Sequence, residues 1–370
     1  MSIATHRVFA RSSVNAPFAE SFDRLAFLDP VDLGAGLACV SVVGEPSAIA
    51  PGELGLFAPD QATRLRVTES QQATVPFVRV DNAGDVAILL IAGQLIRGGK
   101  QNRGINADAL VAAGGSADIP VTCVERGRWS SGPVGAPEFR ASGFEPSLVR
   151  SMKQRDVSHS RAVAMERRAR MERAGAPSTG AMHCRADQHS VWEAVREFGE
   201  STASHAPNGD LIGSMERHES ARGPRPDAEL PPAPERSGLL FFLDGEFIGG
   251  DLFGTREWSS ALERSLVRSA SMSRDFVRMR ESHPHFPPFG ARRHRSSRAG
   301  AALLDPVAQA QAIVGDALHG RWDDRHPVGS ERSIALSHPF IEATATLDPD
   351  GRLLHLMLGT VRPAWVFGLN

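Results

Sequence analysis

The chain has 370 residues, of which 41% are hydrophobic and 23% are charged. This length exceeds what one hydrophobic core usually supports, so we expect two domains or one domain built of repeats, while the formal net charge of −2 excludes a general attraction to nucleic acid or anionic membranes. Three widely spaced cysteines, no signal-peptide pattern and apolar runs far below the ~18 residues of a membrane span predict a cytoplasmic protein without a membrane partner.

Short strands dominate the first third of the chain. Apolar residues at 37–43 run into Gly44, which indicates a strand that ends in a turn. Further strands are expected at 77–80, 86–92 and 119–124. The second of these is apolar on both faces, which is typical of a strand buried in the middle of a sheet.

One local pattern, a strand, a tight turn with Gly and a second strand, occurs three times. It covers residues 89–96, 241–248 and, with a longer turn, 345–354. This pattern is the strongest local signal of a β-hairpin, and one hairpin cannot bury its own apolar face. We therefore predict an α+β fold, with a mixed or antiparallel sheet built from pseudo-repeated β-hairpins and packed helices. The alternative is that the hairpins are unrelated, since any α+β protein offers several.

Helices are expected between and after these hairpins. Residues 148–174 contain good helix formers without Pro or Gly, a second helix starts after the N-cap Asp187, and two more cover 258–279 and 306–318. Residues 282–300 are expected to be irregular. The predicted organisation is a strand-rich part at 1–145, a helical segment at 146–202, a Pro-rich loop or linker at 203–237, and an α+β part with two further hairpins at 238–370.

An unusual cluster of polar residues follows the first expected hairpin. Only two of the 41 basic residues are Lys, and Lys100 stands in this cluster. Adjacent Gly residues let a backbone approach a ligand closely, and cationic and amide side chains hold phosphate or pyrophosphate well. It is not a Walker loop, because Gln101 stands where Ser or Thr would hold magnesium. The candidate ligand-binding residues here are Gly98, Gly99, Lys100, Gln101, Asn102, Arg103 and Asn106.

The same cluster has a structural alternative, a Gly-Gly bulge at a strand end whose cations pair with acids and whose amides cap loops. Beyond the cluster, Glu125 and Arg128 end an expected strand and are further candidate ligand-binding residues, Arg128 for a phosphate or ribose contact. One interpretation of Trp129 is a side chain that stacks on a nucleotide base, but a tryptophan is more typical of a core position. Gln188, at the start of a helix, is a further candidate for a ligand contact.

Neither a metal site nor nucleic-acid binding is predicted. His183, Cys184 and His189 lack the second pair that a zinc site usually needs. The segment 150–173 carries eight basic and three acidic residues, but it lacks aromatic residues, and we interpret it as a solvated helix rather than a nucleic-acid contact. No cofactor is assigned.

The segments 98–103, 119–129 and 187–192 resemble a bacterial family with no settled activity, the ADP-ribosylglycohydrolase and rhodanese-phosphatase associated domain family. The likeness covers most of the chain and is thinner before residue 70 and in the Pro-rich insertions. The resemblance implies a setting near NAD and ADP-ribose processing rather than a reaction. Where the family's first hairpin turn reads Asp-Gly-Glu, this chain has the sequence Ala-Gly-Gln at 92–94, so no catalytic role is assigned to that turn.

The leading hypothesis is a cytoplasmic protein that binds a small, nucleotide-like phosphorylated ligand linked to NAD or ADP-ribose metabolism. Whether it also transforms that ligand is left open, so no enzyme class is assigned. The alternative is a non-catalytic protein-interaction module, in which the Gly-Gly turn is structural and the partner is another protein.

Overall fold

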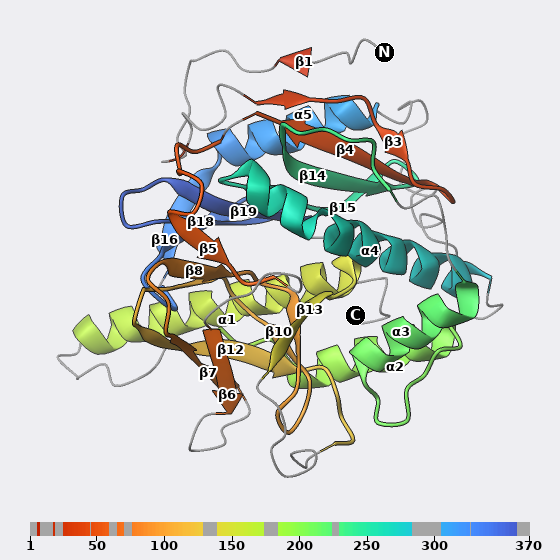
Figure 1. Cartoon of the computed structure of the whole chain (residues 1–370), viewed down its shortest axis with the longest axis horizontal. Coiled ribbons are helices and arrows are strands. Elements are labelled where there is room, and N and C mark those ends of the chain that lie inside the picture. Colours follow the sequence, from red (N-terminus) through yellow and green to blue (C-terminus); the bar gives the residue numbers. More distant parts are fainter. Residues whose placement is uncertain are drawn as a thin grey trace.

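The structure is a computed structural model of the chain, shown as a cartoon in Figure 1. It describes residues 6–7, 18, 25–44, 46–58, 65–69, 76–128, 139–173, 184–223, 229–282, 305–325 and 327–360. The expectations for Trp129, for His183 and for all but the first residue of the irregular stretch 282–300 lie outside these residues.

The largest sheet in the described part of the chain has ten strands, all paired antiparallel. Its order is β1 (His6–Arg7), β2 (Ala26–Phe27), β4 (Leu37–Val43), β14 (Arg236–Leu243), β15 (Glu246–Phe253), β19 (Leu353–Thr360), β18 (Ile341–Leu347), β17 (Arg332–Ser337) and β16 (Arg321–Arg325), with β3 (Val31–Asp32) paired to β4.

Two smaller sheets come from the N-terminal part of the chain. In the smaller of them, β5 (Leu54–Leu56) runs parallel to β8 (Ala87–Leu90), so that sheet is mixed. The six-stranded sheet has the order β13 (Arg140–Phe144), β9 (Gln94–Arg97), β10 (Arg103–Ile105), β12 (Ser116–Cys123), β7 (Phe77–Asn82) and β6 (Leu65–Glu69), and the three-stranded sheet has the order β11 (Ala109–Val111), β8 (Ala87–Leu90) and β5 (Leu54–Leu56).

Five helices are described, and each of the four helices expected from the sequence is present. Three N-caps use the side chain of Asp187, Asp210 or Thr255 to accept amide hydrogen bonds from the first turn. None of the described helices is long and apolar enough to cross a membrane. The helices are α1 (Ser147–Arg173), α2 (Gln188–Ser201), α3 (Leu211–Arg222), α4 (Arg256–Glu281) and α5 (Pro306–His319).

The α+β prediction is confirmed, and two of the three expected hairpins form. Strand β14 pairs with β15, and β18 pairs with β19. In the turn between β14 and β15, Asp244 and Gly245 both have positive φ angles, 51° and 75°, which is the backbone of a two-residue hairpin turn.

The expected hairpin at 89–96 is wrong in its pairing, because β8 and β9 belong to different sheets. Gly93, with φ of 84°, turns the chain from one sheet into the other. The side chain of Gln94 then replaces the missing strand partner: its Oε1 accepts from the Ile91 amide (2.8 Å), and its Nε2 donates to the Phe57 carbonyl oxygen (2.5 Å). The segment is therefore a corner between sheets.

The prediction of a loop or linker at 203–237 is also wrong, since α3 occupies much of that segment. Asp210 begins this helix by accepting hydrogen bonds from the Ile212 and Gly213 amides. Leu211, Ile212 and Met215 are buried in the main core. Tertiary packing stabilises this 12-residue helix, whose local sequence is a modest signal.

Helices cover both faces of the large sheet, and the alternation along β14 shows how. Leu239 and Phe241 belong to a core cluster shared with α4, whereas Leu240 and Phe242 belong to a second cluster shared with α5. Figure 1 shows α5 above these strands and α4 below them, with α1, α2 and α3 in the lower half. All eight residues of β14 are buried as a result.

The main core joins parts of the chain that are far apart in sequence. It contains Leu89 of β8, Phe198 of α2, Met215 of α3 and Phe253 of β15. The segments at 1–145, 146–202, 203–237 and 238–370 therefore contribute to one hydrophobic cluster. This packing brings the polar loop after β9 against the start of α3.

Candidate functional site

The predicted ligand loop connects β9 to β10, which pair antiparallel with Arg103 opposite Ile96. Gly98 and Gly99 have φ angles of 139° and 51°, in the region that side chains disfavour. A Cβ atom at Gly99 would lie 2.2 Å from Cζ of Phe139, so there is no room for a side chain. The turn itself therefore requires glycine.

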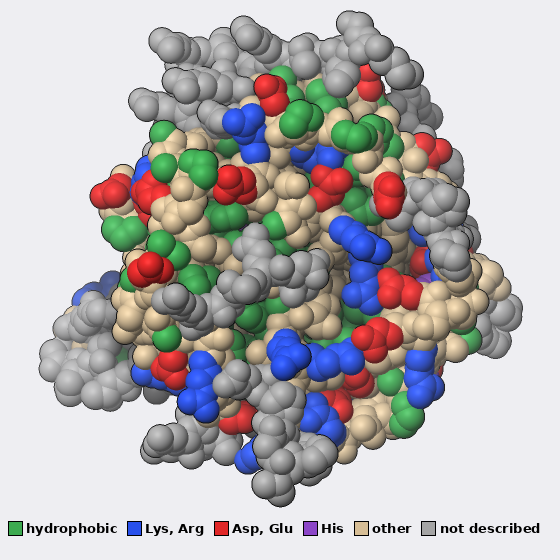
Figure 2. Space-filling view, viewed as in Figure 1, with side chains coloured by type: hydrophobic (Ala, Val, Ile, Leu, Met, Phe, Trp, Pro, Cys, Tyr) green, Lys and Arg blue, Asp and Glu red, His purple; other side chains and the backbone are tan. Residues whose placement is uncertain are grey.

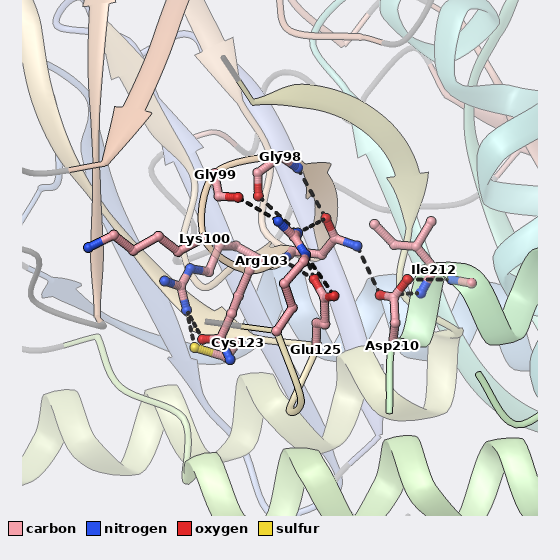
Figure 3. Close-up of polar contacts among 12 residues, drawn as sticks. Gly98, Gly99, Lys100, Arg103, Cys123, Glu125, Asp210 and Ile212 are labelled. Atoms are coloured by element: carbon pink, nitrogen blue, oxygen red, sulfur yellow. Dashed lines mark hydrogen bonds and ion pairs between the residues drawn. The ribbon is translucent and has the colours of Figure 1, made fainter. Parts of the chain in front are cut away.

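Arg128 holds this loop through its guanidinium group. Figure 3 shows the polar contacts around Gly98, Gly99 and Glu125. Nη1 donates to the Gly99 carbonyl oxygen (2.6 Å) and Nη2 to the Gly98 carbonyl oxygen (3.3 Å). Nε and Nη2 also bind the buried Glu125 carboxylate at 2.8 and 2.7 Å, and these hydrogen bonds raise the pKa of Arg128. The Arg128 side chain is 25% exposed, so its cationic guanidinium group still reaches the surface.

Asn102 links the loop to α3. Its Oδ1 accepts from the Gly98 amide (3.0 Å), its backbone amide donates to Glu125 (2.9 Å), and its Nδ2 donates to Asp210 (3.0 Å). Burial raises the pKa of Asp210, while the bond from Asn102 lowers it in part. Sequence analysis missed Asp210, although its position as an N-cap three residues before Gly213 was a usable signal.

Arg103 points into the protein and is 1% exposed. Its Nη1 donates to the Gln101 side chain (3.2 Å) and contacts the Cys123 sulfur, and its Nη2 lies 3.7 Å from Glu69. Burial raises the pKa of the Cys123 thiol. The same Glu69 carboxylate accepts from the Lys100 amide (2.9 Å). These contacts occupy Arg103 within the loop's interior.

Gln188 and Asn106 are also bonded to the backbone of neighbouring segments. Gln188 forms two hydrogen bonds with Cys123, accepting from its amide (3.0 Å) and donating to its carbonyl oxygen (2.8 Å). Asn106 donates to the Cys184 carbonyl oxygen (2.9 Å) and accepts from Thr122 (2.8 Å). Asn106 therefore lies in contacts separate from those of Gly98, Gly99, Asn102, Glu125 and Arg128, which form one network.

The outer face of the loop is defined here by the cations Lys100, Arg126 and Arg128, together with Trp192 of α2 beside Arg126. Arg126 is exposed, and its guanidinium carbon lies 5.5 Å from the ring centroid of the half-buried Trp192. Lys100 is partly exposed, and Figure 3 shows its side chain extending away from Glu125. In the space-filling view, several Lys and Arg side chains, with acidic ones among them, lie in the lower half of the molecule (Figure 2).

A second polar centre, which sequence analysis missed, is enclosed in the fold. His355 of β19 contacts Asp108 through Nδ1 (2.7 Å) and Asp251 through Nε2 (3.0 Å). Arg150 of α1 pairs with Asp251 (2.6 Å), and Thr346 donates to Asp108 (2.6 Å). All four ionisable side chains are buried.

The charges of this centre stabilise one another. Burial alone would lower the pKa of His355, but the two carboxylates raise it to about 9. Burial would likewise raise the pKa of Asp251, but Arg150 and His355 lower it to about 2. The four groups thus form a neutral set of two cations and two anions at pH 7. A pocket of about 10 Å³ that includes Arg150 and Asp251 in its lining has room for little more than a water molecule.

The other lysine of the chain is structural. Lys153 and Glu145 are both 0% exposed and paired at 2.5 Å, and Lys153 also donates to the Ile105 carbonyl oxygen (2.9 Å). Burial lowers the pKa of Lys153 and raises that of Glu145. Among the described residues, no group of three or more His, Cys, Asp or Glu side chains has an arrangement that could hold a metal ion.

A comparison with known protein families shows which family the chain belongs to. The model of the ARG and Rhodanese-Phosphatase-superfamily-associated Protein domain matches residues 25–358. The chain belongs to this family. The match extends from the residue before β2 to Leu358 in β19, so it includes both polar centres. No curated protein and no solved structure matches the chain significantly.

The turn at 92–94 contacts the second polar centre. The Ala92 amide donates to Asp108 (2.8 Å) and its carbonyl oxygen accepts from Arg150 Nε (2.9 Å). Arg150 packs so closely that a Cβ atom at Gly93 would lie 2.4 Å from its Cδ. The turn at 92–94 is therefore held by the ionic groups of the second polar centre.

Proposed function

We propose that the protein binds a small phosphorylated ligand of nucleotide type at the outer face of the Gly98–Arg103 loop. The observation that carries the proposal is the position of Arg128, a partly exposed cation that is fixed by the Glu125 carboxylate and by the carbonyl oxygens of Gly98 and Gly99. A cation held in place before binding loses little conformational entropy when it pairs with phosphate.

Two features support an extended ligand with more than one charged group. Lys100 and Arg126 lie at different positions of the outer face, and both reach solvent. The interior of the loop is already filled by hydrogen bonds, so phosphate groups would meet the side-chain cations rather than the loop amides. An ADP-ribose-like molecule, whose pyrophosphate joins two ribosyl groups, fits such a spread of cations better than inorganic phosphate does.

The family name supports the metabolic part of the proposal. Its words associate the domain with ARG, the ADP-ribosylglycohydrolases, and with a rhodanese-phosphatase superfamily. We therefore propose NAD or ADP-ribose metabolism as the setting. No catalytic step is assigned, because the loop's polar side chains bond one another and the second polar centre is buried.

Isothermal titration calorimetry with ADP-ribose and NAD tests this function. Wild type is compared with Lys100→Ala, and Arg196→Ala is the control, because Arg196 is a 45% exposed cation of α2 that pairs with Glu200. We expect Lys100→Ala to weaken binding by about tenfold, the equivalent of about 1.4 kcal/mol, and Arg196→Ala to bind as wild type. Absence of binding to folded wild-type protein overturns the proposal.

A second candidate function is a non-catalytic protein-interaction module. It is favoured by one specific observation: the amide side chains of Gln101, Asn102, Asn106 and Gln188 are all hydrogen-bonded within the chain. In that case Arg103→Ala lowers stability, and neither ADP-ribose nor NAD raises the melting temperature of the wild type. A ligand-dependent rise in that temperature argues against this alternative.

A further inference from the structure

Arg126 and Trp192 form a cation–π pair beside the loop. The guanidinium carbon lies 5.5 Å from the indole centroid, within the range of a cation–π contact. Arg126 is exposed, so its side chain reaches solvent while its guanidinium group lies over the Trp192 ring. The indole Nε1 is buried and has no hydrogen-bond partner among the described residues, which is exceptional for a polar atom in a folded protein.

The pair is tied to the same backbone segment as the phosphate-binding cations. Gln188 and Trp192 are four residues apart, so they share one face of α2. Gln188 binds the backbone of Cys123 through both ends of its amide. The carbonyl oxygen of Arg126 in turn accepts from Gln101 of the loop (3.4 Å). The segment 123–128 therefore carries both Arg126, which contacts Trp192 of α2, and Arg128.

This arrangement combines two chemistries that a nucleotide needs. Flat guanidinium and indole groups stack on the π-face of any base, whereas a sugar phosphate offers no such face. The neighbouring cations of the outer face supply the phosphate contacts. A site for phosphate alone has no use for an exposed arginine stacked on a tryptophan.

We propose that Arg126 and Trp192 form a nucleobase subsite, and that the ligand class is therefore nucleoside phosphates rather than sugar phosphates or inorganic phosphates. The base stacks on the side of the Arg126 guanidinium that faces away from Trp192. This inference rests on the proposed function, because it assigns the base end of the ligand whose phosphates meet the outer face.

Calorimetry with three probes tests it: ADP, ribose 5-phosphate and pyrophosphate. We expect wild type to bind ADP at least about tenfold more tightly than the other two, since one base stack contributes about that factor. Arg126→Ala is expected to weaken ADP binding by about tenfold and to change pyrophosphate binding less than twofold. Lys100→Ala is expected to weaken all three, and Arg196→Ala, one helical turn after Trp192, is the control.

The possible outcomes separate the inference from the function on which it rests. Equal affinity of wild type for ADP and pyrophosphate overturns the nucleobase subsite and leaves phosphate binding intact. Equal loss for both probes in Arg126→Ala also overturns it, because Arg126 then contacts phosphate. No binding of any probe overturns both proposals. Trp192→Phe keeps an aromatic ring in α2 and is expected to retain part of the preference for ADP, and circular dichroism confirms that each variant is folded.

Discussion

The side chain of Asn102 donates to the carboxylate of Asp210 (3.0 Å), and the same carboxylate caps α3 by accepting from the Ile212 and Gly213 amides at 3.2 and 2.9 Å. One carboxylate thus fixes both the polar loop and the start of a helix more than a hundred residues later. The loop and α3 are therefore expected to lose order together when this carboxylate is removed.

Asp210→Ala tests this coupling, and Asp187→Ala is the matched control. Asp187 caps α2 in the same way, through the His189 and Ser190 amides, but has no contact with the loop. Loss of a cap costs about 1 kcal/mol of unfolding free energy. We expect Asp210→Ala to lose about 1 kcal/mol more than Asp187→Ala, since its bond from Asn102 is partly buried, whereas the bond that Asp187 accepts from the Ser190 hydroxyl is exposed. Urea unfolding measures both, and equal losses contradict the coupling.

Gly99 and Gly114 offer a test of close packing at the loop. Both have positive φ angles, 51° and 64°, so alanine at either position strains the backbone by about 1–2 kcal/mol. At Gly99 the new Cβ atom would also lie 2.2 Å from the Phe139 ring, whereas nothing lies within 4 Å at Gly114. We expect Gly99→Ala to lose at least about 1 kcal/mol more than Gly114→Ala in urea unfolding. Similar losses would show that the loop is not packed against Phe139.

His355 makes the free energy of unfolding depend on pH in the alkaline range. Its pKa is raised from 6.5 to about 9, so its ionic contacts with Asp108 and Asp251 contribute fully below pH 6.5 and are lost as the pH rises through about 9. Arg150, Thr346 and the stacked ring of Phe253 also pack around this group. We expect the unfolding free energy to fall by about 3 kcal/mol between pH 6.5 and 9.5 from this group.

Urea unfolding across this pH range measures the effect, and NMR of the imidazole signals assigns it. The His355 signals should not titrate below pH 8. Lys153 acts in the opposite sense, because a lowered pKa makes stability rise with pH as that group loses its proton. A His355 signal that titrates near pH 6.5 contradicts the charged state.

Local sequence signals predicted the elements better than their connections. Helix formers and caps placed α1, α2, α4 and α5 correctly, because these signals act within one turn. The corner at Gly93 was missed because Gln94 replaces strand pairing through a side chain that bonds Phe57. No local pattern reveals that choice. Helix α3 was missed because its stability comes from contacts with distant elements.

The candidate site shows the same division. Glycines, amides and cations at 98–103 marked an unusual loop, and the structure places several of them in one network with Glu125 and Arg128. The direction of each side chain was not predictable, so Arg103 appeared equal to Lys100 although it is 1% exposed. The centre around His355 escaped notice because its partners Asp108 and Asp251 are more than a hundred residues away. In the sequence, the only mark of Asp251 is that it follows two glycines.

The two lysines of the chain provide a final prediction, because one is partly exposed and the other has no exposed surface. Lys153→Met leaves the Glu145 carboxylate buried without its cation, which costs about 3–5 kcal/mol. Lys100→Met changes a partly exposed position and is expected to cost less than about 0.5 kcal/mol. The double variant Glu145→Gln with Lys153→Met removes both charges and should recover more than half of the loss. Equal stability of the two single variants, measured by urea unfolding, contradicts the burial of this ion pair.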